Sequence, residues 1–404
     1  MVKRYYGGLI SATPTTVNSS SASGIFNTNQ QMQAKRAGNW PTPAAPPVPY
    51  NLWSWGQNSY GNLGLGTQFT SYSSPKQVGS LTNWKNIAAG GFSGYSIKTD
   101  GTFWAWGRNG YGRLGLGDTT PVSSPTQVGS LTDWATVSAG SQCFIAVKTD
   151  GTMWSCGANN AGVLGLNNST YYSSPKQIGS GTTWSTTSVV QFNCLALKTD
   201  GTLWSWGSGY QGGLGLGTTT SYSSPVQIGA LTSWSKISAG ENTGFAIKTD
   251  GTLWAWGNNG SGFQGRLGLG DTTKRSSPVQ IGSDTNWASV AANRNHNAAT
   301  KTDGTLWTIG QNSYGELGNN GTSSTYTWNQ VGALTNWLKA SAGNYFTTAI
   351  KTNGTLWAWG SDQGGVLAQG YIFNNTSPNQ VGSLTSWIDV AAGNSHRFVL
   401  ATKQ

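Results

Sequence analysis

The sequence predicts an all-β fold, a seven-bladed β-propeller that follows an irregular N-terminal segment. The first observation behind this prediction is a pattern of an apolar residue, Trp, any two residues and Gly, which recurs every 50 to 53 residues. The second is a hairpin signal inside each copy. The third is composition: 58 of 404 residues are Gly and 21 are Trp, whereas only 9% are charged. An ordinary globular domain has about 25% charged residues.

Seven copies of this repeat fill the chain after residue 50. Each copy carries an LWxWG run, a Gly-rich stretch, an SPxQV segment, and a Trp that leads through small apolar residues into AIKTDG. About fifty residues with four short strands, repeated in tandem, are typical of propeller blades. Because stacking buries both apolar faces of a blade, we expect the copies to close into a ring. They begin at Leu52, Phe103, Met153, Leu203, Leu253, Leu306 and Leu356.

The turn inside each copy is predicted to be a two-residue β-hairpin. In the second copy the turn is Asp100–Gly101, between two alternating apolar runs. Asp-Gly is a preferred pair for a type I′ turn, because both turn residues need positive φ. This register places Thr99 opposite Thr102, and Ile97 opposite Trp104. The equivalent turn residues in five copies are Asp100, Asp150, Asp200, Asp250 and Asp303.

Repeated aromatic and basic positions accompany these turns. Nineteen of the 21 Trp fall at three repeated positions, which indicates packing between blades. Cys156 and Ile309 take two places where the pattern expects Trp. At the end of the chain, Phe398–Leu400 is expected to pair with Leu52–Trp55 and so close the ring. Six Lys lie two residues before the turn positions and are expected to form a solvated ring at the blade edges: Lys98, Lys148, Lys198, Lys248, Lys301 and Lys351.

The motifs WGxNxxGxLGLG, SPxQV and AAGxxHxxAL, at a spacing near fifty residues, resemble the regulator of chromosome condensation repeat. The resemblance covers residues 51–404 and implies a seven-bladed β-propeller. Copies six and seven depart from the pattern at Glu316–Asn319 and Val366–Gln369, and Tyr326–Trp328 replaces the usual Ser-Ser-Pro. These departures are interpreted as loop variation, or as the mark of one specialised side.

Residues suited to catalysis or metal binding are scarce. Five of the 13 acidic residues are the hairpin Asp residues, and the others are scattered. His296 and His396 align in two copies, have no acidic neighbour in sequence and are expected to be structural. Cys143, Cys156 and Cys194 lack the CxxC spacing of a zinc site and give no disulfide framework. We therefore expect no catalytic residue, no metal, no cofactor and no enzymatic activity.

The loops after the first strand of each copy hold a candidate ligand-binding rim. Tyr recurs in these loops, several Arg lie nearby, and the fifth copy has three extra residues. Exposed aromatic rings beside Asn, Gln and Ser suit a glycan, because sugar rings stack on aromatics while their hydroxyls bond to amides. Family-typical loop packing, and charge that serves solubility, are the alternative interpretations. The candidate residues are Tyr60, Arg108, Tyr111, Arg113, Tyr210, Phe263, Gln264, Arg266 and Tyr314.

Residues 1–50 do not match the repeat and are rich in Ser, Thr, Asn and Gln. Residues 1–40 are predicted to be an anchor segment, and residues 41–50, with five Pro, a stiff linker to the propeller. The segment carries +4 of the formal net charge of +10 and no acid. It begins with basic residues but lacks an apolar core after them, so it is a poor secretory signal. The chain has no run of 18 apolar residues, and we expect no membrane insertion.

The N-terminal segment also resembles the leaders of virion proteins in marine tailed phages. The similarity lies in Tyr5–Ser11, Gly24–Asn27, Gln30–Ala34 and Gly38–Pro41. In those proteins similar leaders precede unrelated distal domains, which implies attachment to the particle with the propeller pointing outward. The anchor residues that the resemblance implies are Tyr5, Tyr6, Ile25, Phe26, Met32 and Trp40.

Together these features favour a non-enzymatic virion protein, either a tail-fibre-like adhesin or an outer capsid fibre or decoration protein. Its expected partners are other virion proteins, through residues 1–40, and a host-surface glycan or protein. We expect synthesis in the host cytoplasm and a homotrimer formed through the leader. Four basic residues in the leader are few for nucleic-acid binding, which is not expected. An intracellular protein- or chromatin-binding platform and a secreted protein inhibitor are the alternatives.

Overall fold

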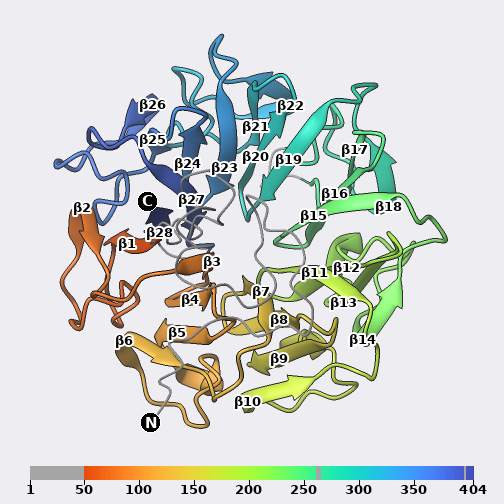
Figure 1. Ribbon diagram of the computed structural model, residues 1–404. Helices are drawn as coiled ribbons and strands as arrows, with labels where there is room; N and C mark the ends of the chain where they lie inside the picture. The colour runs from red at the N-terminus through yellow and green to blue at the C-terminus, as the bar shows by residue number, and fades with distance from the viewer. Residues whose placement is uncertain (1–49, 261–264, 395–396) are drawn as a thin grey trace, which may run out of the picture. The chain divides into compact units, whose positions relative to one another are not determined.

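The computed structural model describes residues 50–260, 265–394 and 397–404, and in these ranges it shows seven four-stranded antiparallel sheets around a common axis (Figure 1). The predicted all-β, seven-bladed propeller is confirmed. Helical segments within the same ranges are 3-10 turns at Gly110–Gly112, Asn160–Gly162 and Tyr210–Gly212. The six anchor residues, and the linker as far as residue 49, lie outside the described residues.

The strands of each blade are given in order from the innermost, which lines the central channel, to the outermost. Blade 1 contains β27 (Trp387–Ala392), β28 (Phe398–Lys403), β1 (Asn51–Gly56) and β2 (Tyr72–Gln77). Blade 2 contains β3 (Trp84–Ala89), β4 (Ser93–Lys98), β5 (Phe103–Gly107) and β6 (Val122–Gln127). Blade 3 contains β7 (Trp134–Ala139), β8 (Cys143–Lys148), β9 (Met153–Gly157) and β10 (Tyr172–Gln177).

The remaining blades repeat this order. Blade 4 contains β11 (Trp184–Val189), β12 (Asn193–Lys198), β13 (Leu203–Gly207) and β14 (Tyr222–Gln227). Blade 5 contains β15 (Trp234–Gly240), β16 (Thr243–Lys248), β17 (Leu253–Gly257) and β18 (Arg275–Gln280). Blade 6 contains β19 (Trp287–Ala292), β20 (His296–Lys301), β21 (Leu306–Gly310) and β22 (Thr325–Gln330). Blade 7 contains β23 (Trp337–Ala342), β24 (Phe346–Lys351), β25 (Leu356–Gly360) and β26 (Asn375–Gln380).

Blade 1 joins the two ends of the propeller. Strand β28 pairs antiparallel with β1, with Val399 opposite Trp55 and Phe398 opposite Gly56. The predicted closure of the C-terminal strand onto the first strand is confirmed. Because this blade takes two strands from each end of the sequence, the ring closes by backbone hydrogen bonds as well as by side-chain packing.

The hairpin register differs from the predicted one by one residue. Ile97 pairs with Phe103, and the Lys98 N–H donates to the Thr102 carbonyl at 3.0 Å. Gly101 has a φ of 78°, whereas Asp100 is not among the residues with positive φ. The turn is therefore a three-residue loop with a left-handed Gly, and the predicted type I′ turn is wrong. Asp100 Oδ1 accepts hydrogen bonds from the backbone N–H and the hydroxyl of Thr102, which stabilises this alternative.

One large ring fills the space between each pair of neighbouring blades. It is usually the second Trp of LWxWG, and its cross-strand partner is then Gly, Cys, Thr or Val. A Cβ atom at Gly94, for example, would lie 2.3 Å from Trp106 Cε2. Where Cys156 replaces the Trp, its partner is Phe144, which supplies the ring instead. The seven pairs are Val399–Trp55, Gly94–Trp106, Phe144–Cys156, Cys194–Trp206, Gly244–Trp256, Asn297–Ile309 and Thr347–Trp359.

The same ring links each blade to the loop of the blade before it. Five indole N–H groups donate to the carbonyl of the residue that precedes the Leu of the LG motif. The acceptors are Val366 for Trp55, Asn62 for Trp106, Val163 for Trp206, Gly213 for Trp256 and Glu316 for Trp359, at 2.8 to 3.2 Å. Where the Trp is missing, Tyr95 Oη donates to Arg113 O and Asn297 Nδ2 donates to Arg266 O, each at 2.9 Å. Every junction thus keeps a donor for this buried carbonyl.

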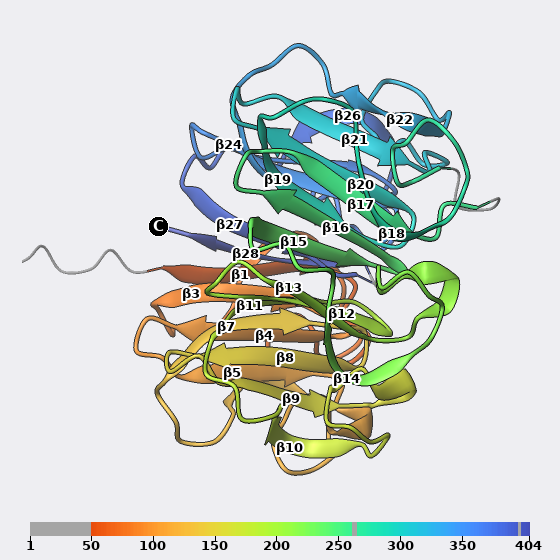
Figure 2. The ribbon, with the colours of Figure 1, turned by 90° about the vertical axis from the view of Figure 1, so that its right-hand side faces the viewer.

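The propeller has two different faces, seen from the side in Figure 2. The hairpin face holds the turns between the second and third strands of blades 2 to 7 and the links to the next blade. The C-terminus, at the end of β28, lies on this side. The loop face holds the short turns between the first and second strands and the long loops between the third and fourth. These loops are residues 57–71, 108–121, 158–171, 208–221, 258–274, 311–324 and 361–374.

Candidate binding surfaces

The repeated Lys of the hairpin face are held between Trp rings. Lys351 Nζ lies 3.6 Å from the ring centroid of Trp357 and 4.7 Å from that of Trp337. Lys148, Lys301 and Lys351 are 6 to 8% exposed. The predicted solvated ring is therefore wrong for these three Lys, which are buried against Trp rings, whereas the other three are half-buried. The other clamped residues of this set are Lys98, Lys198 and Lys248, at 3.8 to 5.8 Å from two Trp centroids each.

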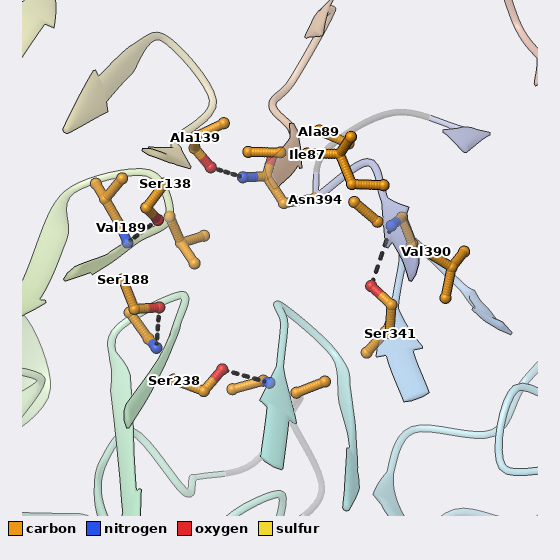
Figure 3. A pocket seen from close by; sticks show the side chains of 18 of the residues that line it. Ile87, Ala89, Ser138, Ala139, Ser188, Val189, Ser238, Ser341, Val390 and Asn394 are labelled. Carbon is orange, nitrogen blue, oxygen red and sulfur yellow. Dashed lines mark hydrogen bonds between the residues drawn. The ribbon is translucent and has the colours of Figure 1, made fainter. Parts of the chain in front are cut away.

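The central channel encloses a cavity of about 300 Å³ lined by the innermost strands (Figure 3). Its walls are mostly Ala, Val and Ser, and the Ser hydroxyls are used to join neighbouring strands. Ser138 Oγ, for example, accepts from the Val189 N–H at 2.9 Å. Asn394 Nδ2 donates to Ala139 O at 3.0 Å and so ties blade 1 to blade 3. Lys339, the charged residue among the described lining, pairs with Asp389. The channel thus offers little chemistry beyond packing.

Two of the predicted rim residues are buried. Arg113 is 2% exposed and its Nη1 donates to Ser141 O at 2.7 Å. Arg266 is fully buried, and its Nη2 donates to Glu241 O at 2.5 Å. Both stand at the position whose carbonyl joins neighbouring blades. Their guanidinium groups are therefore used inside the propeller, and the structure does not bring them to the surface of the rim.

The other rim residues form separate aromatic groups on the loop face. Tyr60 packs edge-on against Phe92, and the Arg108 guanidinium lies 4.8 Å from the Tyr60 centroid. Tyr111 is 48% exposed and Tyr210 is 60% exposed. The ring centroids of Tyr111 and Tyr171 lie 5.4 Å apart. Those of Tyr314, which is 38% exposed, and Tyr345 lie 5.3 Å apart. Phe263 and Gln264 lie outside the described residues. The rim's binding role remains a prediction.

Four strongly exposed apolar side chains on the loop face were not predicted. Phe69 is 79% exposed, and Tyr371, Ile372 and Phe373 are 50, 66 and 71% exposed. They belong to the long loops of blades 1 and 7, which are neighbours in the ring. In the fourth copy the corresponding positions carry Thr. Alignment of the copies just after LGLG is the sequence signal that identifies these residues.

Buried titratable groups are used structurally. His296 is fully buried, its Nε2 lies 2.8 Å from Thr347 Oγ1, and burial lowers its pKa to about 3. The prediction of a structural, hydrogen-bonded His is confirmed for His296, while His396 lies outside the described residues. Burial raises the pKa of Cys143 to about 12. Burial also raises the pKa of Glu316 to about 7, although Glu316 Oε2 accepts from the Tyr314 N–H.

The described residues show neither a metal site nor a membrane-crossing helix. No group of three or more His, Cys, Asp or Glu among them has the arrangement of a metal site. None of their helices is long and apolar enough to cross a membrane.

The geometry and the repeat agree with a known family. The model of the regulator of chromosome condensation (RCC1) repeat matches residues 51–94, 100–147, 200–247, 250–300, 303–350 and 353–400. The chain belongs to the RCC1 repeat family. A second model of the same repeat matches 234–262, 287–316 and 338–365. The family resemblance inferred from the motifs is thereby confirmed, whereas the resemblance of residues 1–40 to phage leaders remains a prediction.

Curated relatives of this RCC1-repeat chain match it over short segments. Human HERC3, a probable E3 ubiquitin-protein ligase, is 42% identical over 69 residues, which are 17% of this chain and 7% of HERC3. The regulator of chromosome condensation of Xenopus laevis is 34% identical over 70 residues, which are 17% of this chain and 16% of that protein. The matched part is thus a small fraction of each relative.

Solved structures show the same fold at low identity. Human WBSCR16 has a TM-score of 0.77 at 20% identity, covering 88% of this chain and 99% of that one. Prp20p from Saccharomyces cerevisiae, described with its binding properties to Gsp1p and histones, has a TM-score of 0.75 at 20% identity, covering 94% and 95%. Yeast RCC1 (Prp20) bound to Kap60 has a TM-score of 0.77 at 19% identity, covering 100% of this chain and 96% of that one.

Proposed function

We propose that this chain is a non-enzymatic binding module that presents its loop face to a macromolecular partner. The observation that carries the proposal is the contrast between repeated and unrepeated residues. The Trp, Lys, Asp and small residues that recur in the copies are committed to packing and hydrogen bonds. The exposed Phe69 and Tyr371–Phe373 are peculiar to two copies and lie on the loop face. Exposed apolar side chains grouped on one surface are typical of interaction sites.

Two further facts support a binding role without catalysis. The described His and Cys side chains are buried, and several carry pKa values moved away from the range useful in proton transfer. Prp20p, which has this fold, is described with its binding properties to Gsp1p and histones, and yeast RCC1 (Prp20) is bound to Kap60 in its solved structure. We therefore propose that the loop face of this chain binds a protein or a glycan.

The finer proposal is a virion protein, in which residues 1–40 attach to the particle and the propeller faces the host. What supports it is the phage-like leader in the sequence, together with the Pro-rich linker of residues 41–50. Location on the virion, synthesis in the host cytoplasm and a homotrimer formed through the leader are parts of this proposal. Many weak sites displayed together would raise the effective affinity for a surface.

Particle incorporation tests the virion proposal. Purified particles that encode the chain are analysed by mass spectrometry, with the full chain and with a version lacking residues 2–49. We expect the full chain in particles and the truncated propeller at least tenfold depleted. Equal incorporation of both versions, or absence of the full chain from particles, contradicts the anchor.

Surface substitution tests the loop face. A variant with Phe69→Ser, Tyr371→Thr, Ile372→Thr and Phe373→Thr is expected to bind host cells at least tenfold more weakly than the parent. The matched control, Leu81→Thr with Leu384→Thr, changes residues that are 41 and 38% exposed on the hairpin face. Binding is measured by flow cytometry with the labelled, multimerised chain. Equal binding by the variant and the parent contradicts the proposal.

A further inference from the structure

We propose that grooves between the outer strands of neighbouring blades each bind a neutral pyranose unit of a polysaccharide. This inference rests on the proposed binding function but concerns a different surface from the loop face. Four such grooves, of about 280 to 410 Å³, lie at the junctions of blades 2 and 3, 3 and 4, 4 and 5, and 6 and 7. Small-molecule sites begin at about 300 Å³, which suits one sugar ring.

All four grooves are built from the same parts. The blade that comes first contributes the middle of its long loop and the Gln that ends its outer strand. The next blade contributes two Trp and a Ser-Pro pair of its outer strand. One of the two Trp is half-buried and forms an aromatic wall. These wall residues are Trp154, Trp204, Trp254 and Trp357.

The polar groups of the grooves are amides and hydroxyls. The groove Gln side chains are Gln127, Gln177, Gln227 and Gln330, and among the described residues their amides have no hydrogen bond. In the other three copies the same Gln folds back onto the chain. Gln77, Gln280 and Gln380 donate to Gly79, Gly282 and Gly382 carbonyls at 3.0 to 3.3 Å. The four groove amides therefore remain available to a ligand.

One junction is built differently from the four groove junctions. Between blades 5 and 6, Trp328 replaces the Pro of the Ser-Pro pair. Its ring centroid lies 5.4 Å from that of Trp287, the counterpart of a groove Trp. A Cβ atom at Gly268 would lie 2.3 Å from Trp328 Nε1. Gly268 corresponds to Gly115, which lines the groove of blades 2 and 3. The indole of Trp328 thus takes the core position of the Trp missing at Ile309, whereas at the four groove junctions Phe144, Trp206, Trp256 or Trp359 holds that position and the groove lies beside it.

The lining favours a neutral sugar over other occupants. Among the described residues that line the four grooves none is acidic, and the Lys that reach two of them are clamped between Trp rings. An aromatic wall serves the C–H face of a pyranose, while amide and hydroxyl groups serve its oxygens. A purely apolar ligand would leave the Gln amides unpaired. Repetition around the ring matches the repetition of a polysaccharide, so weak sites add.

A glycan array of neutral oligosaccharides, probed with the full chain, identifies the ligand. The neutral glycan that binds most strongly is then titrated into the parent chain and two variants, and binding is followed by intrinsic Trp fluorescence. The groove variant carries Gln127→Ala, Gln177→Ala, Gln227→Ala and Gln330→Ala. The matched control carries Gln77→Ala, Gln280→Ala and Gln380→Ala, which removes the amides that are already bonded. We expect at least a tenfold loss of affinity in the groove variant and less than a twofold loss in the control.

Three results overturn the inference. They are the absence of any neutral glycan bound at millimolar concentration, equal losses in the two Gln variants, and binding of an oligoproline peptide, but of no sugar, that the groove variant abolishes. The loop-face variant is titrated in parallel. If it still loses host-cell binding while the grooves bind no sugar, the groove inference fails and the proposed function stands. If glycan binding depends on the groove Gln while the loop-face variant binds cells normally, the groove inference stands and the proposed role of the loop face fails.

Discussion

Cys156→Trp is predicted to destabilise the junction of blades 2 and 3. The Phe144 ring already fills the space that an indole fills at other junctions. A Cβ atom at Gly115 would lie 3.0 Å from Phe144 Cε1, so the ring rests directly on this Gly. A second ring at position 156 would need the same volume. In addition, the Arg113 carbonyl that would receive the new indole N–H already accepts the Tyr95 hydroxyl.

The expected loss follows from these two effects. Overpacking a core costs about 1–3 kcal/mol, and a buried donor with a contested acceptor adds about 1–3 kcal/mol. Cys156→Trp should therefore lower the free energy of unfolding by about 2–5 kcal/mol. Adding Tyr95→Leu and Phe144→Gly reproduces the residues found at the junction of blades 4 and 5, namely Leu195, Gly244 and Trp256. Because this triple change roughly conserves volume, its loss should stay below about 2 kcal/mol.

Guanidinium chloride denaturation followed by far-UV circular dichroism measures these differences. Phe144→Gly alone is included and should cost about 3–5 kcal/mol, because it leaves a cavity. The non-additivity of the single and combined changes then reports the coupling between the two positions. The reasoning is refuted if Cys156→Trp is as stable as the parent chain, or if the triple variant is no more stable than Cys156→Trp.

Four further outcomes are expected. Gly101→Ala should lower the free energy of unfolding by about 1–3 kcal/mol, because its Cβ would meet Thr132 O at 2.0 Å; Gly79→Ala, where φ is also positive but the space is open, should cost less in the same denaturation assay. Lys351→Met should cost about 1 kcal/mol through loss of its cation–π contacts, measured against Lys85→Met, a change at an exposed Lys of β3. Hydrogen bonds from Thr202 hold the pKa of Asp200 below its usual value, so its stabilisation is present above about pH 4 and is lost as pH falls through the folded pKa; Asp200→Asn, which imitates Asn353 of the seventh copy, should reduce acid sensitivity in a pH series of thermal melts. Burial raises the pKa of Glu316 to about 7, so the chain should lose stability as pH rises from about 5 to 8, and Glu316→Gln should flatten that slope; an unchanged slope contradicts the assignment.

The propeller itself was predictable because its signal repeats. Seven copies, each with an apolar-Trp pattern and a Gly-bearing turn, define the number of blades, their strands and the closure of β28 onto β1. The hairpin register was mispredicted because Asp-Gly suits two turn types. The hydrogen bonds of Asp100 to Thr102 decided between them. Because the Asp-Gly pair suits both turn types, side-chain hydrogen bonds decide which of them forms. The turn sequence alone does not show which of these bonds will be made.

Candidate sites were harder to predict than the fold. Arg113 and Arg266 look like surface cations in sequence, yet both are buried against backbone carbonyls. Lys148 looks like a solvated amine, yet two Trp rings enclose it. In each case the side chain is long enough to reach partners in another strand or loop. Its exposure therefore depends on what stands there in three dimensions.

By itself the sequence determined the all-β class, seven blades and the joining of the chain ends, because periodic apolar spacing needs no knowledge of distant contacts. Only the tertiary structure decided which residue supplies the ring at each blade junction. Phe144 stands in for the Trp missing at Cys156, and Trp328 for the one missing at Ile309. These exchanges link residues from different strands through shared volume. Four junctions whose core ring is in place also carry a groove between the outer strands, in which sugar binding is proposed.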